Sequence, residues 1–294
     1  MINMIRQKAF TLIELLVVIA IIGLLTTLVL VNTSGTQGRA KVAKALEYSS
    51  QVYSALGSEV IGIWNFDNGT GTIAYDNSGY GNNGIISGAL FATDTPYHVV
   101  GSGIGKYSLN FDGVDDYVTL SSNVTKGLTA FTVLIWIKPN DASASLTLLG
   151  DYRISTDNSL AAEIYDNALT STWRPRIQLK GATLPRTAFY GDVATALSYG
   201  VWSLYGATWD GTAVQLYVNG VADGPSSSYV DTSLLTNPTF TTFIGAYAAG
   251  AGMANINGLI DDVRVYGTAL TASEIQRHYA KGLEKHQNLA TVIK

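Results

Sequence analysis

The chain contains no cysteine, only three histidines and few charged residues. The absence of cysteine excludes a disulfide framework and a lipoprotein anchor. Two of the histidines, His278 and His286, lie near the C-terminus, so the sequence contains neither a catalytic triad nor a zinc-ligand set. Charged residues make up 14% of the 294 residues, and no cluster of Lys and Arg is available to neutralise phosphates. We therefore expect no nucleic-acid partner.

Glutamate is also scarce, with six among the 22 acidic residues. Glycoside hydrolases need two carboxylates that face each other across the sugar, about 5–10 Å apart. Only Glu163 lies well inside the region with a strand pattern, and no second glutamate accompanies it. We therefore expect that the protein is not an enzyme.

The residues that are abundant indicate a β-rich exported domain. The chain is 47% hydrophobic and holds 30 glycines and 17 tyrosines. Such a composition is more typical of an extracellular β-domain than of a cytosolic helical enzyme. About 220 residues remain for this domain beyond the N-terminal segment, enough to bury a core without disulfides.

The N-terminal segment KAFTLIELLVVIAIIGLL, Lys8 to Leu25, is apolar apart from its basic start and Glu14. A carboxylate inside a bilayer costs a few kcal/mol unless it has a partner. The partner that fits is a free amino terminus, created by cleavage between Ala9 and Phe10.

This segment closely resembles the signal of type IV prepilins. The resemblance implies that leader residues 1–9 are removed by a prepilin peptidase, that Phe10 is N-methylated, and that Glu14 pairs with a subunit amine during assembly. Removal of a leader carrying Arg6 and Lys8 changes the net side-chain charge from −4 to −6. One departure is Ala9, where the family usually has glycine. The alternatives are a Sec signal peptide and a plain signal anchor; no small-x-small cleavage site follows the apolar run, and an anchor leaves Glu14 unexplained.

Residues 10–60 are predicted to form one long helix. Its first part, 10–31, spans roughly 33 Å as a helix, enough to cross a bilayer. From 36 to about 58 the apolar residues fall at helical spacing, which predicts an amphipathic continuation. In type IV pilins such a helix packs in the filament core below a globular head.

From Ile61 onward the hydrophobic period changes to two. The dipeptides Asp210-Gly211 and Asn219-Gly220 suit tight hairpins, and Thr271 with Glu274 forms a capping box that begins a helix ending near Leu283. Residues 284–294 form a tail. We expect an antiparallel sandwich or jelly roll. The predicted strands are Ile61–Phe66, Tyr107–Phe111, Tyr117–Leu120, Phe131–Ile137, Leu146–Leu149, Ala162–Tyr165, Trp202–Trp209, Val214–Val218, Thr241–Ala246 and Leu259–Tyr266.

The region 61–283 resembles the laminin-G-like, concanavalin-A-like jelly roll of secreted bacterial proteins. The resemblance is carried by DNSGYGNNG, YSLNFDGVDDYVTL, FTVLIWIKP, WSLYGATWDGTAVQLYVNG and GLIDDVRVYGTALTASEIQRHY, which follow one another along the chain. The family includes lectins and inert spacer domains. The resemblance therefore implies a β-sandwich with an adhesive or structural role.

A calcium site is predicted from aspartate positions. Side-chain alternation places Asp261 on the face of Val263 and Val265, and Asp116 on the inward face of its strand. Inward carboxylates need a cation or several donors, and calcium prefers carboxylate oxygens. Because the family often binds calcium near such positions, Asp116 and Asp261 are the leading ligands, with Asp76 as a third. The alternative is that these aspartates accept backbone hydrogen bonds in loops.

Sugar binding needs exposed aromatic side chains. Trp136, Trp202 and Trp209 match core positions of the family, whereas Trp173 has no obvious strand partner and is the candidate platform for a ligand. The adjoining Arg174 and Arg176 are alternatively candidates to pair with acids of a neighbouring subunit.

Together these features predict a type IV pilin-like structural subunit of a cell-surface filament or pseudopilus that displays a jelly-roll head. Its partners would be identical or related pilins, the prepilin peptidase, the membrane before assembly, and a surface glycan or protein. It would move from the cytoplasmic membrane to the extracellular filament. The alternative is a minor tip adhesin or a membrane-anchored lectin-like carbohydrate-binding module.

Overall fold

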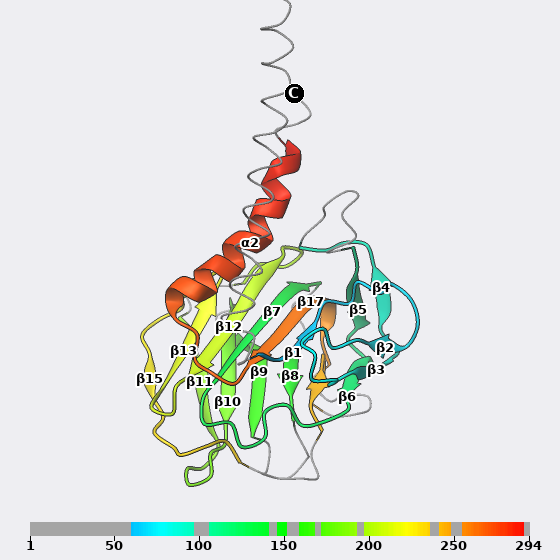
Figure 1. The fold of residues 1–294 in the computed structure, drawn as a ribbon. Coiled ribbons are helices and arrows are strands. Elements are labelled where there is room, and N and C mark those ends of the chain that lie inside the picture. The colour runs from blue at the N-terminus through cyan, green and yellow to red at the C-terminus, as the bar shows by residue number, and fades with distance from the viewer. Residues whose placement is uncertain are drawn as a thin grey trace, which may run out of the picture. The chain divides into compact units, whose positions relative to one another are not determined.

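A computed structural model describes residues 60–96, 106–140, 146–151, 159–167, 172–192, 197–235, 241–247 and 255–290 (Figure 1). The predicted leader, with the cleavage site between Ala9 and Phe10, lies outside these residues, as does Glu14. The predicted long helix lies outside them too, up to Val60, which already begins the first strand. Among the described residues, no helix is long and apolar enough to span a membrane.

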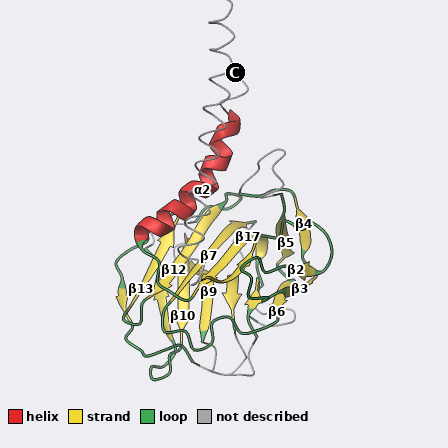
Figure 2. Cartoon of the chain, viewed as in Figure 1, coloured by secondary structure: helices red, strands yellow, loops and turns green. Residues whose placement is uncertain are grey.

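The head is built from two antiparallel sheets, A and B, as the alternating pattern predicts (Figure 2). Sheet A contains β1 (Val60–Trp64), β4 (Leu90–Ala92), β5 (Ser108–Asp112), β7 (Phe131–Pro139), β12 (Ser203–Trp209), β13 (Ala213–Val218), β14 (Val221–Ala222), β15 (Ser227–Ser228) and β17 (Asn257–Tyr266). Sheet B contains β2 (Ile73–Ala74), β3 (Gly84–Ser87), β6 (Tyr117–Leu120), β8 (Leu146–Gly150), β9 (Leu160–Asn167), β10 (Thr172–Leu179), β11 (Thr187–Tyr190) and β16 (Phe243–Ile244).

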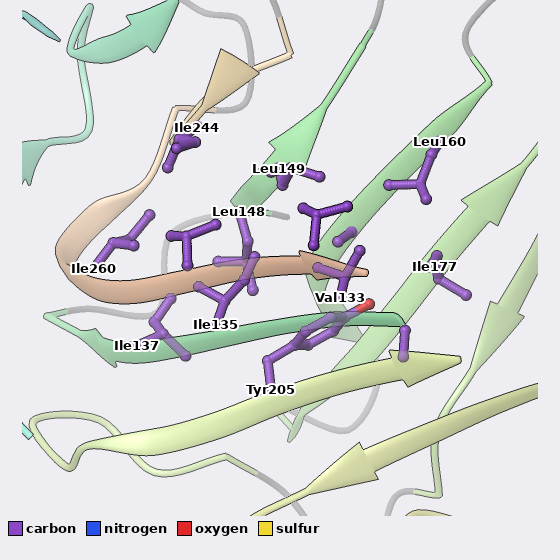
Figure 3. Packing of buried hydrophobic residues seen from close by; sticks show 14 of the residues in the cluster. Val133, Ile135, Ile137, Leu148, Leu149, Leu160, Ile177, Tyr205, Ile244 and Ile260 are labelled. Atoms are coloured by element: carbon purple, nitrogen blue, oxygen red, sulfur yellow. The ribbon is translucent and has the colours of Figure 1, made fainter. Parts of the chain in front are cut away.

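The core lies between the two sheets, where alternate residues of each strand meet (Figure 3). Sheet A contributes Val133 and Ile135 of β7, and sheet B contributes Leu160 of β9 and Ile177 of β10; all four are fully buried. Burial of each such side chain stabilises the fold by about 1.5–3 kcal/mol. The same alternation decides which residues of β9 and β10 point away from the core.

A bulge divides β17 into two halves. Up to Ile260 the strand pairs with β5, and from Val263 it pairs with β1. Between them the register against β7 shifts, and Asp262 has a positive φ of 44°. An extra residue in one strand changes which face the following side chains occupy. Side chains before and after the bulge therefore do not follow a single alternation between the two faces of sheet A.

Helix α2 (Ala272–Ala290) covers part of sheet A. It begins as predicted, since the backbone N–H of Thr271 donates to Glu274 Oε2 at 2.7 Å and the N–H of Glu274 donates to Thr271 Oγ1 at 3.3 Å. Tyr279 stacks on Trp136 of β7, with ring centroids 5.7 Å apart. The helix continues beyond the predicted end at Leu283, because the sequence that follows contains no strong helix breaker.

Candidate functional site

Asp76 organises the glycine-rich loop before β3. Its Oδ1 accepts the backbone N–H groups of Ile63 (3.0 Å) and Ser78 (2.9 Å), and its Oδ2 accepts the N–H of Asn82 and the hydroxyl of Ser78, both at 2.8 Å. Burial raises the pKa of this carboxyl, but the four hydrogen bonds outweigh burial and hold the pKa below its usual value. The contacts of Asp76 match the loop-capping alternative for this residue.

Asp116 lies in an acidic cluster with Asp112 and Asp115. One carboxylate oxygen from each residue lies within 4.8 Å of the others, and this is the single such group of three among the described residues. Asp116 is 6% exposed, and burial raises its pKa, with Asp112 and Asp115 contributing repulsion. Asp116 Oδ2 accepts the backbone N–H of Asp112 at 2.8 Å. Three carboxylates can bind a calcium ion. The carboxylates that lie near Asp116 are those of Asp112 and Asp115, and not those of the predicted ligands Asp76 and Asp261.

The predicted grouping of Asp76, Asp116 and Asp261 is wrong, because these three residues do not form a cluster. The predicted orientation of Asp261 is also wrong. Asp261 lies opposite Trp136, which stacks under α2, whereas Val263 and Val265 belong to the core; the bulge at Asp262 breaks the alternation. Asp261 is 1% exposed, and burial next to Asp262 raises its pKa well above the usual value.

The prediction that Trp173 is an exposed platform is wrong. Trp173 is 2% exposed, belongs to the core cluster and packs edge-on against Tyr199 at 4.9 Å. The reason is that the stretch around it is a strand, β10, whose odd-numbered residues alternate into the core with Ile177. Trp209 belongs to the core cluster as predicted, whereas Trp136 is buried under α2 and outside that cluster. The core prediction is wrong for Trp202, which is partly exposed and donates to Asp94.

The even-numbered residues of β10 form a polar face on sheet B that was not among the predicted sites. A row of directly opposed residues crosses four strands, from Thr147 to Glu163, Arg176 and Tyr190. Glu163 is fully buried, and its Oε2 accepts hydrogen bonds from Arg176 Nε at 2.5 Å and Gln178 Nε2 at 2.6 Å. We call the residues Thr147, Glu163, Tyr165, Arg174, Arg176, Gln178 and Tyr190 the polar face.

Arg174 lies between two tyrosines of this face. Its guanidinium carbon is 4.6 Å from the ring centroid of Tyr190 and 5.6 Å from that of Tyr165. Arg176 stacks on Tyr165 at 4.5 Å, and the two rings contact each other edge to face at 5.2 Å. Such cation–π contacts fix flexible arginines in place. The alternation of Arg174, Arg176 and Gln178 with apolar neighbours was the signal that could have identified β10.

The polar face contains polar atoms with unused hydrogen-bonding capacity. Thr147 Oγ1, Glu163 Oε1 and Arg174 Nε are buried and have no hydrogen-bond partner among the described residues. Because buried polar atoms are normally paired, such a group is a candidate for bound water or ligand. Arg176 pairs with Glu163 inside the chain, and the alternative that Arg174 and Arg176 pair with acids of a neighbouring subunit stays a prediction.

Two packed antiparallel sheets with a short terminal helix define a lectin-type β-sandwich. The chain belongs to the concanavalin A-like lectin/glucanases superfamily, whose family model matches residues 112–276. Residues 4–30 match the prokaryotic N-terminal methylation motif, so the chain carries a prepilin-type signal followed by a lectin-like head. No curated protein matches the chain.

Solved structures share the fold at low identity. Domain 4 of AbnA, an extracellular arabinanase of Geobacillus stearothermophilus, is 18% identical with a TM-score of 0.55; the match covers 74% of this chain and 97% of that domain. The binding domain of Paraclostridial Mosquitocidal Protein 1 is 14% identical with a TM-score of 0.57, and the Trypanosoma rangeli sialidase is 16% identical with a TM-score of 0.52; the matches cover 76% of this chain in both cases. The chain spans about half of the mosquitocidal domain and a third of the sialidase (52% and 32%). At this identity the likeness establishes the fold alone.

Proposed function

We propose that this protein is a type IV pilin-like structural subunit of a cell-surface filament or pseudopilus, with a jelly-roll head that binds a surface ligand. The observation that carries the proposal is the methylation motif at residues 4–30 in the same chain as a concanavalin A-like head. In this account the peptidase cleaves between Ala9 and Phe10, Phe10 is N-methylated, and the apolar helices bundle in the filament.

Glu14 is the residue on which assembly depends. Its carboxylate is neutralised by the amino terminus of a neighbouring subunit, because an unpaired carboxylate in an apolar bundle is costly. The test compares Glu14→Ala and Glu14→Gln with Thr11→Ala as a control near the same helix end. We expect both Glu14 variants to insert in the membrane and be cleaved, yet be lost from sheared filaments. Normal incorporation of the Glu14 variants would overturn this role.

The head is proposed to bind rather than to catalyse. The described part of the sheets offers one buried glutamate, Glu163, and its Oε2 is held by Arg176 and Gln178. Glycosidase chemistry needs a second carboxylate across the sugar. Binding is supported by analogy with domain 4 of AbnA, which is described in complex with arabinotriose. A surface glycan is therefore the proposed class of partner.

Calcium is the proposed cofactor of the head, with Asp112, Asp115 and Asp116 as ligands. Their three carboxylates fit a hard cation. Asp116 supplies a buried carboxylate, and the exposed Asp112 and Asp115 close the cluster. Bound calcium would supply positive charge that holds the loop between β5 and β6.

A minor tip adhesin is the second candidate function, since an enlarged binding head suits a subunit present in few copies. The two roles differ in the amount of protein in the filament. Quantification of this subunit relative to total pilin in sheared filaments separates them, because a major subunit dominates the filament and a tip subunit is a trace component.

A further inference from the structure

We propose that the polar face of sheet B binds an anionic saccharide, with Arg174 as the residue that contacts its carboxylate. The inference rests on the proposed function in one respect, namely that the head is a binding module. It names a place on the head and a chemical class of ligand.

The first step is the balance of charge on the polar face. Glu163 is matched by Arg176, which lies opposite it and contacts it at 2.5 Å. Arg174 has no such match: among the described residues its side chain makes neither an ion pair nor a hydrogen bond, and its interactions are the two tyrosine rings. The polar face therefore carries one positive charge that the described residues leave uncompensated.

The second step is the form in which this charge is presented. The guanidinium carbon of Arg174 lies over the Tyr190 ring, and the N–H donors of a guanidinium lie at the edge of its plane. A guanidinium edge matches the two oxygens of a carboxylate in a bidentate pair. Because Arg174 is fixed between Tyr165 and Tyr190, little side-chain freedom remains to be lost on binding.

The third step distinguishes a saccharide from other anions. Glu163 Oε1 can only accept hydrogen bonds, and like Thr147 Oγ1 it has no partner among the described residues. Because both oxygens are buried, a water molecule that bridges to a sugar hydroxyl is the donor that suits them, whereas a sulfate ion has no hydrogen with which to hold such a water as donor. Tyr190 is 44% exposed and offers both an apolar ring and a hydroxyl, as sugar binding requires.

The experiment uses the full-length protein in non-ionic detergent and isothermal titration with trigalacturonate. The matched uncharged probe is its methyl ester, and triglutamate tests for an acidic peptide. Arg174→Gln removes the charge, and Lys126→Gln removes an equal charge from an exposed loop position outside the polar face. Arg174→Lys keeps the charge but loses the planar stack.

We expect trigalacturonate to bind, the methyl ester and triglutamate to bind at least about tenfold more weakly, and Arg174→Gln to reduce affinity for trigalacturonate about tenfold or more. Lys126→Gln should retain wild-type affinity, and Arg174→Lys should fall between. If Arg174→Gln does not fold, Arg174→Lys alone decides, because undiminished affinity in that variant contradicts a planar bidentate contact.

The inference is overturned by absence of trigalacturonate binding, by equal binding of the methyl ester, or by full affinity in Arg174→Gln. Tighter binding of triglutamate would show an acidic-peptide site instead. Failure of the inference is distinguishable from failure of the proposed function. A protein that is methylated and present in filaments but does not bind trigalacturonate keeps the subunit role, whereas Arg174-dependent binding by a protein absent from filaments keeps only the inference.

Discussion

Glu163 and Arg176 face each other across β9 and β10, with Arg176 Nε 2.5 Å from Glu163 Oε2, on the side of sheet B that points away from the core. Glu163 is fully buried and the Arg176 side chain is 11% exposed. In a buried pair of this kind each charge offsets the desolvation cost of the other, because either charge alone would be buried without a counter-charge.

Breaking this pair from one side should destabilise the head strongly. We expect Arg176→Gln to lower the free energy of unfolding by about 3–5 kcal/mol, because it leaves the Glu163 carboxylate uncompensated. Lys138→Gln, which breaks the more exposed pair with Asp94, should cost less than about 1 kcal/mol. Urea denaturation followed by tryptophan fluorescence measures both. Similar values for the two variants would show that burial of the Glu163 pair is incomplete.

Asp76 should stabilise the head in a pH-dependent way. Its pKa lies below the usual 3.8 in the folded state, so its contribution is present above that value and is lost as the pH falls through the folded pKa. Asp76→Asn should lower the free energy of unfolding by about 1–2 kcal/mol at neutral pH, because one oxygen acceptor is replaced by a donor. Thermal melts between about pH 2 and 7 should show a smaller difference between the variant and the wild type at the acid end. A constant difference would contradict this assignment.

Asp223 should act in the opposite sense. It is 2% exposed, and burial raises its pKa to about 6; a backbone hydrogen bond with Asp192 lowers the pKa by less than burial raises it, and the Asp192 carboxylate adds repulsion. The folded state binds the proton more tightly than the unfolded chain, so stability is greatest below about pH 4 for this group and is lost as the pH rises to about 6.

Replacement of Asp223 by Asn should therefore raise the free energy of unfolding at pH 7 by about 2 kcal/mol and flatten its dependence between pH 4 and 6. Asp192→Asn, at an exposed position, should give a smaller change in the same direction. Denaturation series at several pH values measure the slope. A destabilised Asp223→Asn at pH 7 would instead indicate that the carboxylate binds a cation or strong donors.

Calcium should stabilise the head through the acidic cluster after β5. Addition of millimolar calcium should raise the melting temperature of the wild-type protein, and a chelator should reverse the rise, because a ligand bound to the folded state shifts the unfolding equilibrium. Asp116→Asn and Asp112→Asn should abolish the shift. Asp76→Asn should retain it, since Asp76 is not part of the cluster. An unchanged melting temperature in the wild type would contradict calcium binding and leave these aspartates with a role in loop hydrogen bonding alone.

Much of the fold follows from local patterns in the sequence. The alternation in β6 and the continuous apolar run of β7 predict strands where the structure has them. The Asn219-Gly220 dipeptide forms the predicted two-residue turn, with both residues at positive φ and Val218 opposite Val221. Gly220 is also required by packing, since a Cβ there would lie 2.8 Å from Tyr279 Cβ of α2.

The site was less predictable, because its geometry depends on features that alternation does not reveal. β10 contains Pro175 and two arginines, which are poor indicators of a strand, so the predicted strands do not include it and Trp173 has no obvious strand partner in the sequence. The bulge in β17 reversed the expected face of Asp261. The partnership of Glu163 and Arg176 depends on the register of β9 and β10, which pairs residues that neither motif nor spacing connects.

The central claim is that this head is carried by a processed pilin-like subunit, and intact-mass spectrometry of sheared filaments tests it most directly. The account predicts a filament component whose mass corresponds to residues 10–294 with one added methyl group on Phe10. An uncleaved chain that retains Met1–Ala9 and is absent from filaments would contradict it and leave a membrane-tethered β-sandwich in its place.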